Sequence, residues 1–184
     1  MKELVFITGN ENKLREAKQI LGSDIVSEKI DLRELQAVDL EDVIEEKLKH
    51  GHEVLKKPVM VEDTGLFFNA LNGFPGALIK MLLDKVGREG VVKVLDGFED
   101  KSAVAKCAVG FTKDGKNLKI FIGEVKGRII EPRGESNFGW DPIFQPEGYD
   151  KTFAEMSAEE KNAISHRFKA LKKFKDYLRG PKNF

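Results

Sequence analysis

The sequence LVFITGNENK at residues 4–13 decides the fold, because an apolar strand there runs directly into a glycine turn. A helical pattern of apolar residues follows at residues 14–21. A glycine lets the backbone approach an anion, and a helix N-terminus presents unpaired N–H groups with a partial positive charge. Lys13 adds a full charge, and Thr8 and Asn10 add neutral donors. The junction therefore predicts an α/β protein with a phosphate-binding turn, although many such junctions bind nothing and this one lacks the spacing of either standard glycine-rich nucleotide loop.

Composition and charge limit the possible classes of protein. The 184-residue chain is 41% hydrophobic, which is enough to bury the core of one domain spanning residues 1–184. Its 31 basic and 31 acidic side chains balance, so no overall field attracts nucleic acid or an anionic membrane. A single cysteine excludes an internal disulfide and is typical of a reducing cytoplasm, and no apolar run is long enough to cross a bilayer. We therefore expect a soluble cytoplasmic protein that recognises its partner locally.

The next part of the chain carries a helix and a strand that lead to two acidic residues. Asp39 can cap a helix that ends before Pro58, and an apolar stripe between them supports it. The buried strand at residues 59–61 is expected to end at Glu62 and Asp63. Ligands in α/β folds gather where strands become loops. Because consecutive strand residues face opposite sides, we expect only one of the two acids to face the cleft.

Farther along, the pattern changes from helix to sheet. A helical face that begins at Leu78 is expected to stop at Gly87. Residues 103–112 and 118–125 alternate as two antiparallel strands joined by a turn at residues 113–116. A string that resembles a P-loop ends in this turn, but it lacks the required Ser or Thr after its lysine and belongs to a hairpin. We therefore exclude a P-loop.

The irregular segment at residues 132–149 holds the only tryptophan, Trp140, within the string FGWDP at residues 138–142. One interpretation is a packing loop in which the tryptophan plugs the core. The other is a purine pocket, in which the flat indole face stacks the base and Asp141 accepts a hydrogen bond from a ring N–H. The segment by itself leaves both interpretations open.

The C-terminal helical region begins with a capping box, SAEE, at residues 157–160. An unbroken helix would direct His166 away from the core, so we expect a break near residues 162–164 with Ser165 capping a second helix. His166 and Arg167 would then lie in its first turn, where cations are unfavourable unless they face an anion or another polar ligand. A solvent-exposed histidine is the simpler alternative.

Two acids are candidate ligands for a divalent metal ion. Mg²⁺ binds oxygen and typically takes one or two carboxylates together with substrate phosphates, which Glu34 and Asp63 could supply. Ordinary surface ion pairing is the alternative for each. Three histidines are too few and too scattered for an all-nitrogen zinc site.

Five ordered motifs span nearly the whole chain. They are TGNENK at 8–13, VEDTG at 61–65, GFPG at 73–76, FGWDP at 138–142 and KNAISHR at 161–167. Together they resemble the inosine triphosphate pyrophosphatase family, whose members hydrolyse non-standard purine nucleoside triphosphates to monophosphate and pyrophosphate. The resemblance implies an elongated α/β domain with a long mixed sheet, two lobes and a central nucleotide-binding cleft. It also implies a homodimer that depends on Mg²⁺.

The resemblance further assigns roles to individual residues. Asp63 matches a metal-site acid that is the general base in some relatives, Glu34 matches a second metal-site acid, and Lys13 matches a catalytic lysine. The residues that match nucleotide-binding positions, from the phosphate end to the base end, are Thr8, Gly9, Asn10, Lys13, Lys47, Thr64, Lys80, Phe138, Gly139, Trp140, Asp141, Lys161, Ser165, His166 and Arg167.

The implied reaction is in-line attack of water on the α-phosphorus, with Mg²⁺ and lysines compensating the charge of the phosphates and of the leaving pyrophosphate. Hypoxanthine and xanthine carry a 6-oxo acceptor and an N1–H donor, whereas adenine reverses both. Donors from His166 or Arg167 would therefore reject ATP. Rejection of GTP would depend on its 2-amino group near Trp140 and Asp141.

Three other functions are weighed against this one. Septum-inhibitor-like pyrophosphatases act on modified nucleotides with a similar fold, but the motifs at residues 138–141 and 165–167 disfavour them. A nucleotide-binding module without turnover would not need Glu34 and Asp63 with a metal ion. A nucleic-acid-binding protein is the weakest alternative, because the net charge is zero and no basic aromatic stripe is present.

Overall fold

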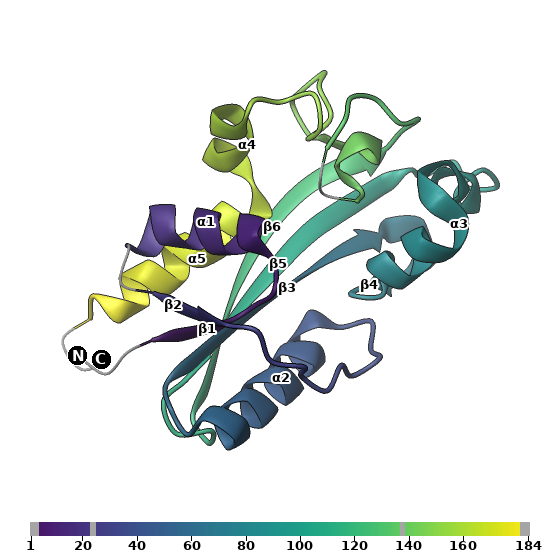
Figure 1. Cartoon of the computed structure of the whole chain (residues 1–184). Helices are drawn as coiled ribbons and strands as arrows, with labels where there is room; N and C mark the ends of the chain where they lie inside the picture. Colours follow the sequence, from purple (N-terminus) through teal and green to yellow (C-terminus); the bar gives the residue numbers. More distant parts are fainter. Residues whose placement is uncertain (1–3, 23–24, 137–138, 181–184) are drawn as a thin grey trace.

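The computed structural model describes residues 4–22, 25–136 and 139–180. They form one mixed sheet of seven strands with helices on both faces (Figure 1). The strands are β1 (Val5–Ile7), β2 (Val26–Glu28), β3 (Val59–Phe68), β4 (Pro75–Gly76), β5 (Ser102–Thr112), β6 (Leu118–Ile129) and β7 (Phe144–Pro146). The helices are α1 (Glu11–Leu21), α2 (Leu40–Leu55), α3 (Ile79–Val94), α4 (Ala158–Ile164) and α5 (His166–Leu178), with short 3-10 helices η1 (Asn69–Leu71) and η2 (Asp141–Ile143). The strand order is β2-β1-β3-β5-β6-β7, and β4 pairs with β3.

The centre of the sheet is an antiparallel group formed by β3, β5 and β6. β5 pairs with the whole of β3, from Val59↔Thr112 to Phe68↔Ala103. It also pairs with β6, from Ser102↔Arg128 to Thr112↔Leu118. This confirms the predicted hairpin. Its turn contains Gly115 at a φ of 71°, a left-handed conformation that favours glycine. The string that resembles a P-loop is therefore a hairpin turn, as expected.

β3 is longer than the sequence predicted, because it continues through both acidic residues to Phe68 instead of ending at Glu62. Its pairing with β5 is uninterrupted. On its other edge, β1 pairs with residues 59–60 and β4 pairs with residues 66–67. Among the described residues, no strand pairs with this edge at residues 61–65, which we call the open edge. The two acids therefore lie beside an unpaired stretch of strand edge inside the sheet, and not at the end of a strand.

The core of the protein consists of three hydrophobic clusters. One lies between α2 and the sheet and includes Ile44 and Leu48, and a second lies on the opposite face, under α1 and α5, and includes Phe174. The third lies at the other end of the long strands, where α3 and the segment after β6 pack around Phe144 and Phe153. Figure 1 shows the long strands running from one group of helices to the other. The expected α/β class, with a long mixed sheet, is confirmed.

The sequence signals at Asp39 and Gly87 can be compared with α2 and α3. Asp39 stands at the N-cap position of α2, but its side chain makes no capping hydrogen bond. α3 is interrupted at Gly87, whose φ of 68° and ψ of −179° are not helical, which confirms the predicted stop. The helix resumes after this kink and ends at Val94. None of the helices in the described part of the chain has the length and hydropathy needed to span a membrane.

The predicted break between α4 and α5 is confirmed. α4 begins with the capping box of Ser157 and Glu160, and Ser165 leaves helical conformation at a ψ of 150°. The Ser165 hydroxyl accepts a hydrogen bond from the Phe168 N–H at 3.1 Å and so caps α5. The two residues that follow Ser165 are buried, so the expectation of a solvent-exposed histidine is excluded.

Candidate active site

A cavity of about 870 Å³ opens along the open edge of β3 and separates the two groups of helices. Of the residues predicted to bind nucleotide or metal, the cavity is lined by Thr8, Gly9, Asn10, Lys13, Glu34, Lys47, Asp63, Thr64, Lys80, Gly139, Trp140, Asp141, Lys161, His166 and Arg167. Ser165 is not part of the lining and acts as the cap of α5. Phe138 lies outside the described residues. The structure therefore gathers side chains from almost every predicted motif around one space.

The turn before α1 is shaped by Asn10. α1 begins at Glu11 and not at residue 14, because the Asn10 side chain caps it by accepting from the N–H groups of Asn12 at 3.0 Å and Lys13 at 3.2 Å. The Asn10 N–H in turn donates to the Thr8 hydroxyl at 3.1 Å. The first turn of α1 consequently opens on the cavity, as the predicted anion-binding turn requires.

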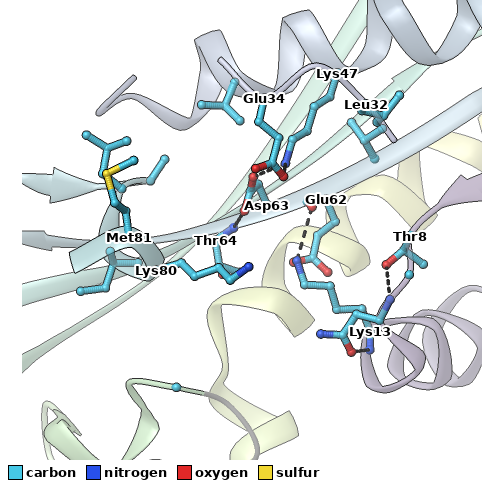
Figure 2. A pocket seen from close by; sticks show the side chains of 18 of the residues that line it. Thr8, Lys13, Leu32, Glu34, Lys47, Glu62, Asp63, Thr64, Lys80 and Met81 are labelled. Atoms are coloured by element: carbon cyan, nitrogen blue, oxygen red, sulfur yellow. Dashed lines mark hydrogen bonds and ion pairs between the residues drawn. The ribbon is translucent and has the colours of Figure 1, made fainter. Parts of the chain in front are cut away.

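On the α5 side of the sheet, Glu62 forms the centre of a buried charge cluster. Its carboxylate accepts from Arg167 Nε at 3.0 Å. The same carboxylate lies 3.3 Å from Lys13 Nζ, and Figure 2 shows Glu62 and Lys13 side by side. Arg167 Nη1 also donates to Glu16 at 3.0 Å. Burial alone would raise the pKa of Glu62, but Arg167 and Lys13 outweigh it and lower the pKa from 4.5 to about 2. Glu62 is therefore an ionised anchor that holds two cavity-lining cations in place.

On the α2 side of the sheet, Asp63 and Glu34 share one lysine. Lys47 Nζ lies 2.6 Å from Asp63 Oδ2 and 3.6 Å from Glu34 Oε1 (Figure 2). The other oxygen of Asp63 accepts from the Thr64 N–H at 2.8 Å. Burial would lower the pKa of Lys47, but Asp63 and then Glu34 outweigh it and raise the pKa. The two carboxylates thus converge on one positive charge.

Only one of the two neighbouring acids was expected to face the cleft, and this expectation is wrong. Glu62 and Asp63 do point to opposite faces of β3, but both line the cavity. The reason is the open edge, since a space beside an unpaired strand edge can reach both faces. Sequence reasoning named Glu62 only as the neighbour of Asp63 and missed Glu16 altogether.

At the other end of the cavity, aromatic rings surround His166. The imidazole centroid lies 5.2 Å from the Trp140 ring, which is tilted against it by 34°, and 5.9 Å from the Phe153 ring, which stacks on it. Burial, and then the charges of Arg167 and Lys161, hold the pKa of His166 well below 6.5. His166 is therefore a neutral imidazole at physiological pH, and its Nδ1 has no hydrogen-bond partner among the described residues.

Trp140 both packs in the core and lines the cavity, so its position agrees with both roles that the sequence left open. The side chain is only 7% exposed and packs edge-on against Phe144 at 5.7 Å between centroids, yet it lines the cavity. Beside it, Asp141 is buried and accepts from Ser136 Oγ at 2.8 Å and from Lys161. A flat aromatic face next to fixed polar groups can recognise a planar heterocycle.

The donor set near Lys47 suits a hard divalent cation. Glu34 and Asp63 offer carboxylate oxygens around one point that a positive charge already occupies. In the described ranges, no three His, Cys, Asp or Glu side chains are placed so that they could together hold a metal ion. A bound metal ion would therefore also need oxygens from a molecule held in the cavity. Mg²⁺ is usually held in this way, by one or two carboxylates together with phosphate oxygens.

The fold and the cavity define a class, namely mixed α/β proteins with a charged cleft beside the open edge of a central strand. The chain belongs to the Ham1 family, whose model matches residues 4–177. It is 51% identical over 179 residues to the inosine triphosphate pyrophosphatase of Yarrowia lipolytica, with 95% of each chain covered.

Solved structures agree with this assignment. The Ham1 protein of Staphylococcus aureus superposes with a TM-score of 0.86 at 30% identity, over 98% of this chain and 100% of that one. A nucleoside-triphosphatase, or dITP/XTP pyrophosphatase, of Mycobacterium abscessus superposes with a TM-score of 0.75 at 28% identity, over 93% of this chain and 97% of that one. The sequence resemblance to this family is thereby confirmed.

Proposed function

We propose that this protein hydrolyses the non-standard purine nucleoside triphosphates ITP, dITP and XTP to nucleoside monophosphate and pyrophosphate. One observation carries the proposal: a single cavity has lysines and carboxylates at one end and a buried aromatic pocket at the other. A triphosphate and a purine base need these two environments at once. The names of the relatives and structural neighbours, with most of each chain covered, support the same reaction.

In the proposed reaction, water attacks the α-phosphorus in line with the departing pyrophosphate. Lys13 and Lys47 lie at the phosphate end and compensate charge that builds up on the phosphoryl oxygens. Of the two neighbouring acids on β3, Asp63 is the one that solvent reaches, so we assign it the role of orienting the water and accepting its proton, or of holding the metal ion. Either role requires an ionised side chain.

We further propose that Glu34 and Asp63 hold Mg²⁺ together with the substrate phosphates. The bound ion would act as a Lewis acid on the phosphoryl oxygens. The two carboxylates already converge on the ammonium of Lys47, which supports a site for positive charge there. A homodimer, a cytoplasmic location and a domain spanning residues 1–184 also stay predictions.

Base selection follows from groups whose protonation is fixed. Arg167 is a cation held by Glu62 and Glu16, so it can only donate, and the neutral His166 can donate from one ring nitrogen. Donors suit the 6-oxo group of hypoxanthine or xanthine. The 6-amino group of adenine would leave them unpaired in a buried site, which is costly. We therefore expect strong rejection of ATP.

The direct test is release of pyrophosphate and monophosphate from ITP, XTP, GTP and ATP, with Mg²⁺ and with a chelator. The proposal predicts metal-dependent formation of IMP and pyrophosphate from ITP, with ATP nearly inert. A variant with Asp63→Asn, purified in parallel, controls for contaminating phosphatases. Tight ITP binding without turnover would instead favour a binding module, and equal turnover of ATP would contradict the proposed selectivity.

A further inference from the structure

Arg88 makes an unusual contact between α3 and the loop that forms the base end of the cavity. Its Nε donates to the Gly139 carbonyl at 2.8 Å, and its Nη2 donates to the Ser136 carbonyl at 3.3 Å. One guanidinium thus binds the backbone at two points shortly before Trp140. We call the described residues 134–136 and 139–141 the base loop.

A second contact joins the same two segments. A Cβ built on Gly139 would lie 3.2 Å from Leu83 of α3, so the glycine permits a close approach of the loop backbone to this helix. Leu83 also packs against the hydrophobic cluster that contains Trp140. α3 therefore contacts the base loop twice, through an apolar side chain before its kink and through Arg88 immediately after it.

The base loop has little regular structure to fix its position. Between the end of β6 and the start of η2 the described residues form neither helix nor strand. Backbone carbonyls in such a segment need partners, and bonds from a charged donor are stronger than neutral ones. The planar guanidinium suits this task, because its several donors have a fixed geometry that lysine cannot reproduce.

The loop backbone in turn determines the side chains at the base end. Ser136, whose carbonyl Arg88 binds, donates its hydroxyl to Asp141 at 2.8 Å. Asp141 also accepts from Lys161, and the Trp140 ring contacts His166 at 5.2 Å between centroids. Displacement of the loop would therefore move the indole ring and the Asp141 carboxylate together.

We propose that Arg88 is a positioning residue that fixes the base loop against α3, so that Trp140 and Asp141 are in place before the nucleotide arrives. This pre-organisation lowers the ordering cost of binding. Loss of the contact should raise KM and leave kcat nearly unchanged, because Arg88 does not line the cavity and its hydrogen bonds go to the base loop. The kinetic part of this inference rests on the proposed function.

The test uses Arg88→Met and, as a matched control, Lys93→Met, which removes the same charge from an exposed position in the last turn of the same helix. We expect KM for ITP to rise about threefold to tenfold in Arg88→Met, with kcat within about twofold of wild type. Arg88→Lys, which keeps the charge but loses the fork, should give an intermediate KM. Lys93→Met should resemble wild type.

A second readout does not depend on turnover. Trp140 is the only tryptophan, and it is 7% exposed, so quenching of its fluorescence by acrylamide reports how well the free protein holds the base loop. Quenching should increase in Arg88→Met and not in Lys93→Met. Wild-type KM and quenching in Arg88→Met, or equal changes in both methionine variants, would overturn the proposal. Absence of ITP hydrolysis by wild type would refute the proposed function instead, while the quenching comparison would still decide the role of Arg88.

Discussion

Glu62 and Asp63 are neighbours on β3, yet their surroundings are opposite. The Glu62 side chain is 1% exposed and lies between Arg167 and Lys13, whereas Asp63 is 24% exposed and pairs with Lys47. The alternation of a strand places them on opposite faces, and the open edge lets one cavity reach both. One carboxylate is thus sealed by cations from α1 and α5, and the other is accessible to solvent and ligand.

The difference indicates a division of labour between two acids of similar chemistry. A buried carboxylate is tolerated only when cations surround it, and removal of such a partner leaves buried charge uncompensated. An accessible carboxylate with one cation near it can exchange that cation for a metal ion or contact water. We therefore assign Glu62 to holding the binding cations and Asp63 to the reaction.

The largest expected effect is that of Asp63→Asn on turnover. The loss of the ionised carboxylate should reduce kcat for ITP by about 10³-fold, which is typical of a removed general base or metal ligand. The melting temperature should change little, because Asp63 is partly exposed. Asp84→Asn, an exposed acid of α3 that lines the same cavity, is the matched control and should keep near wild-type activity. Turnover of Asp63→Asn within a few-fold of wild type would remove Asp63 from the chemistry.

Glu62→Gln is expected to reduce the stability of the fold, which Asp63→Asn should leave nearly unchanged. The amide leaves Arg167 and Lys13 without their buried anion, so the free energy of unfolding should fall by about 3 kcal/mol. Urea titration monitored by circular dichroism measures this loss. Asp63→Asn should lose less than about 1 kcal/mol in the same titration. Equal losses in the two variants would contradict the proposed division.

The pH dependence of stability tests whether the buried Glu62 carboxylate is stabilised by its cations. Arg167 and Lys13 lower the pKa of Glu62 from 4.5 to about 2 in the folded state, so its stabilising contribution is complete above pH 4.5. That contribution is lost as the pH falls from 4.5 toward 2. The difference in unfolding free energy between wild type and Glu62→Gln should therefore shrink by about 2 kcal/mol between pH 6 and pH 3. A difference that stays constant over this range would show that the folded-state pKa is not depressed.

The smallest effect separates the two lysines. Lys13→Met should cost about 1 kcal/mol of stability, since Glu62 keeps Arg167 but loses its second cation. Lys47→Met should cost less, because Asp63 and Glu34 can be solvated without it. Thermal unfolding of the two variants side by side measures the difference. A larger loss of stability in Lys47→Met than in Lys13→Met would contradict the assignment of Glu62 as the buried acid and Asp63 as the accessible one.

Local signals allowed several elements to be predicted from the sequence. The hairpin turn around Gly115 and the break at Ser165 each depend on residues close in the chain, namely turn formers and a capping hydroxyl. Four of the five motifs contribute side chains to the cavity, whereas residues 73–76 do not line it. The start of α1 was misplaced, although Asn10 before a helical pattern is itself a capping signal that could have located it.

Contacts between distant segments account for what was missed. The end of β3 was misplaced because two charged residues usually interrupt a buried strand, and nothing near Glu62 reveals that Arg167, 105 residues later, will neutralise it. The position of Glu62 beside Asp63 was the only local signal. The bonds from Arg88 to the carbonyls of Ser136 and Gly139 leave no pattern in the sequence, since backbone acceptors are the same for every residue.

If Asp63 has the proposed role, water next to it on the α2 side of β3 attacks the α-phosphorus of the nucleotide. The most direct measurement is hydrolysis of ITP in water labelled with the heavy oxygen isotope, followed by mass spectrometry of both products. Attack on the α-phosphorus puts the label into IMP and leaves pyrophosphate unlabelled. Label in pyrophosphate, or release of labelled orthophosphate, would place the attack on another phosphorus and contradict the account.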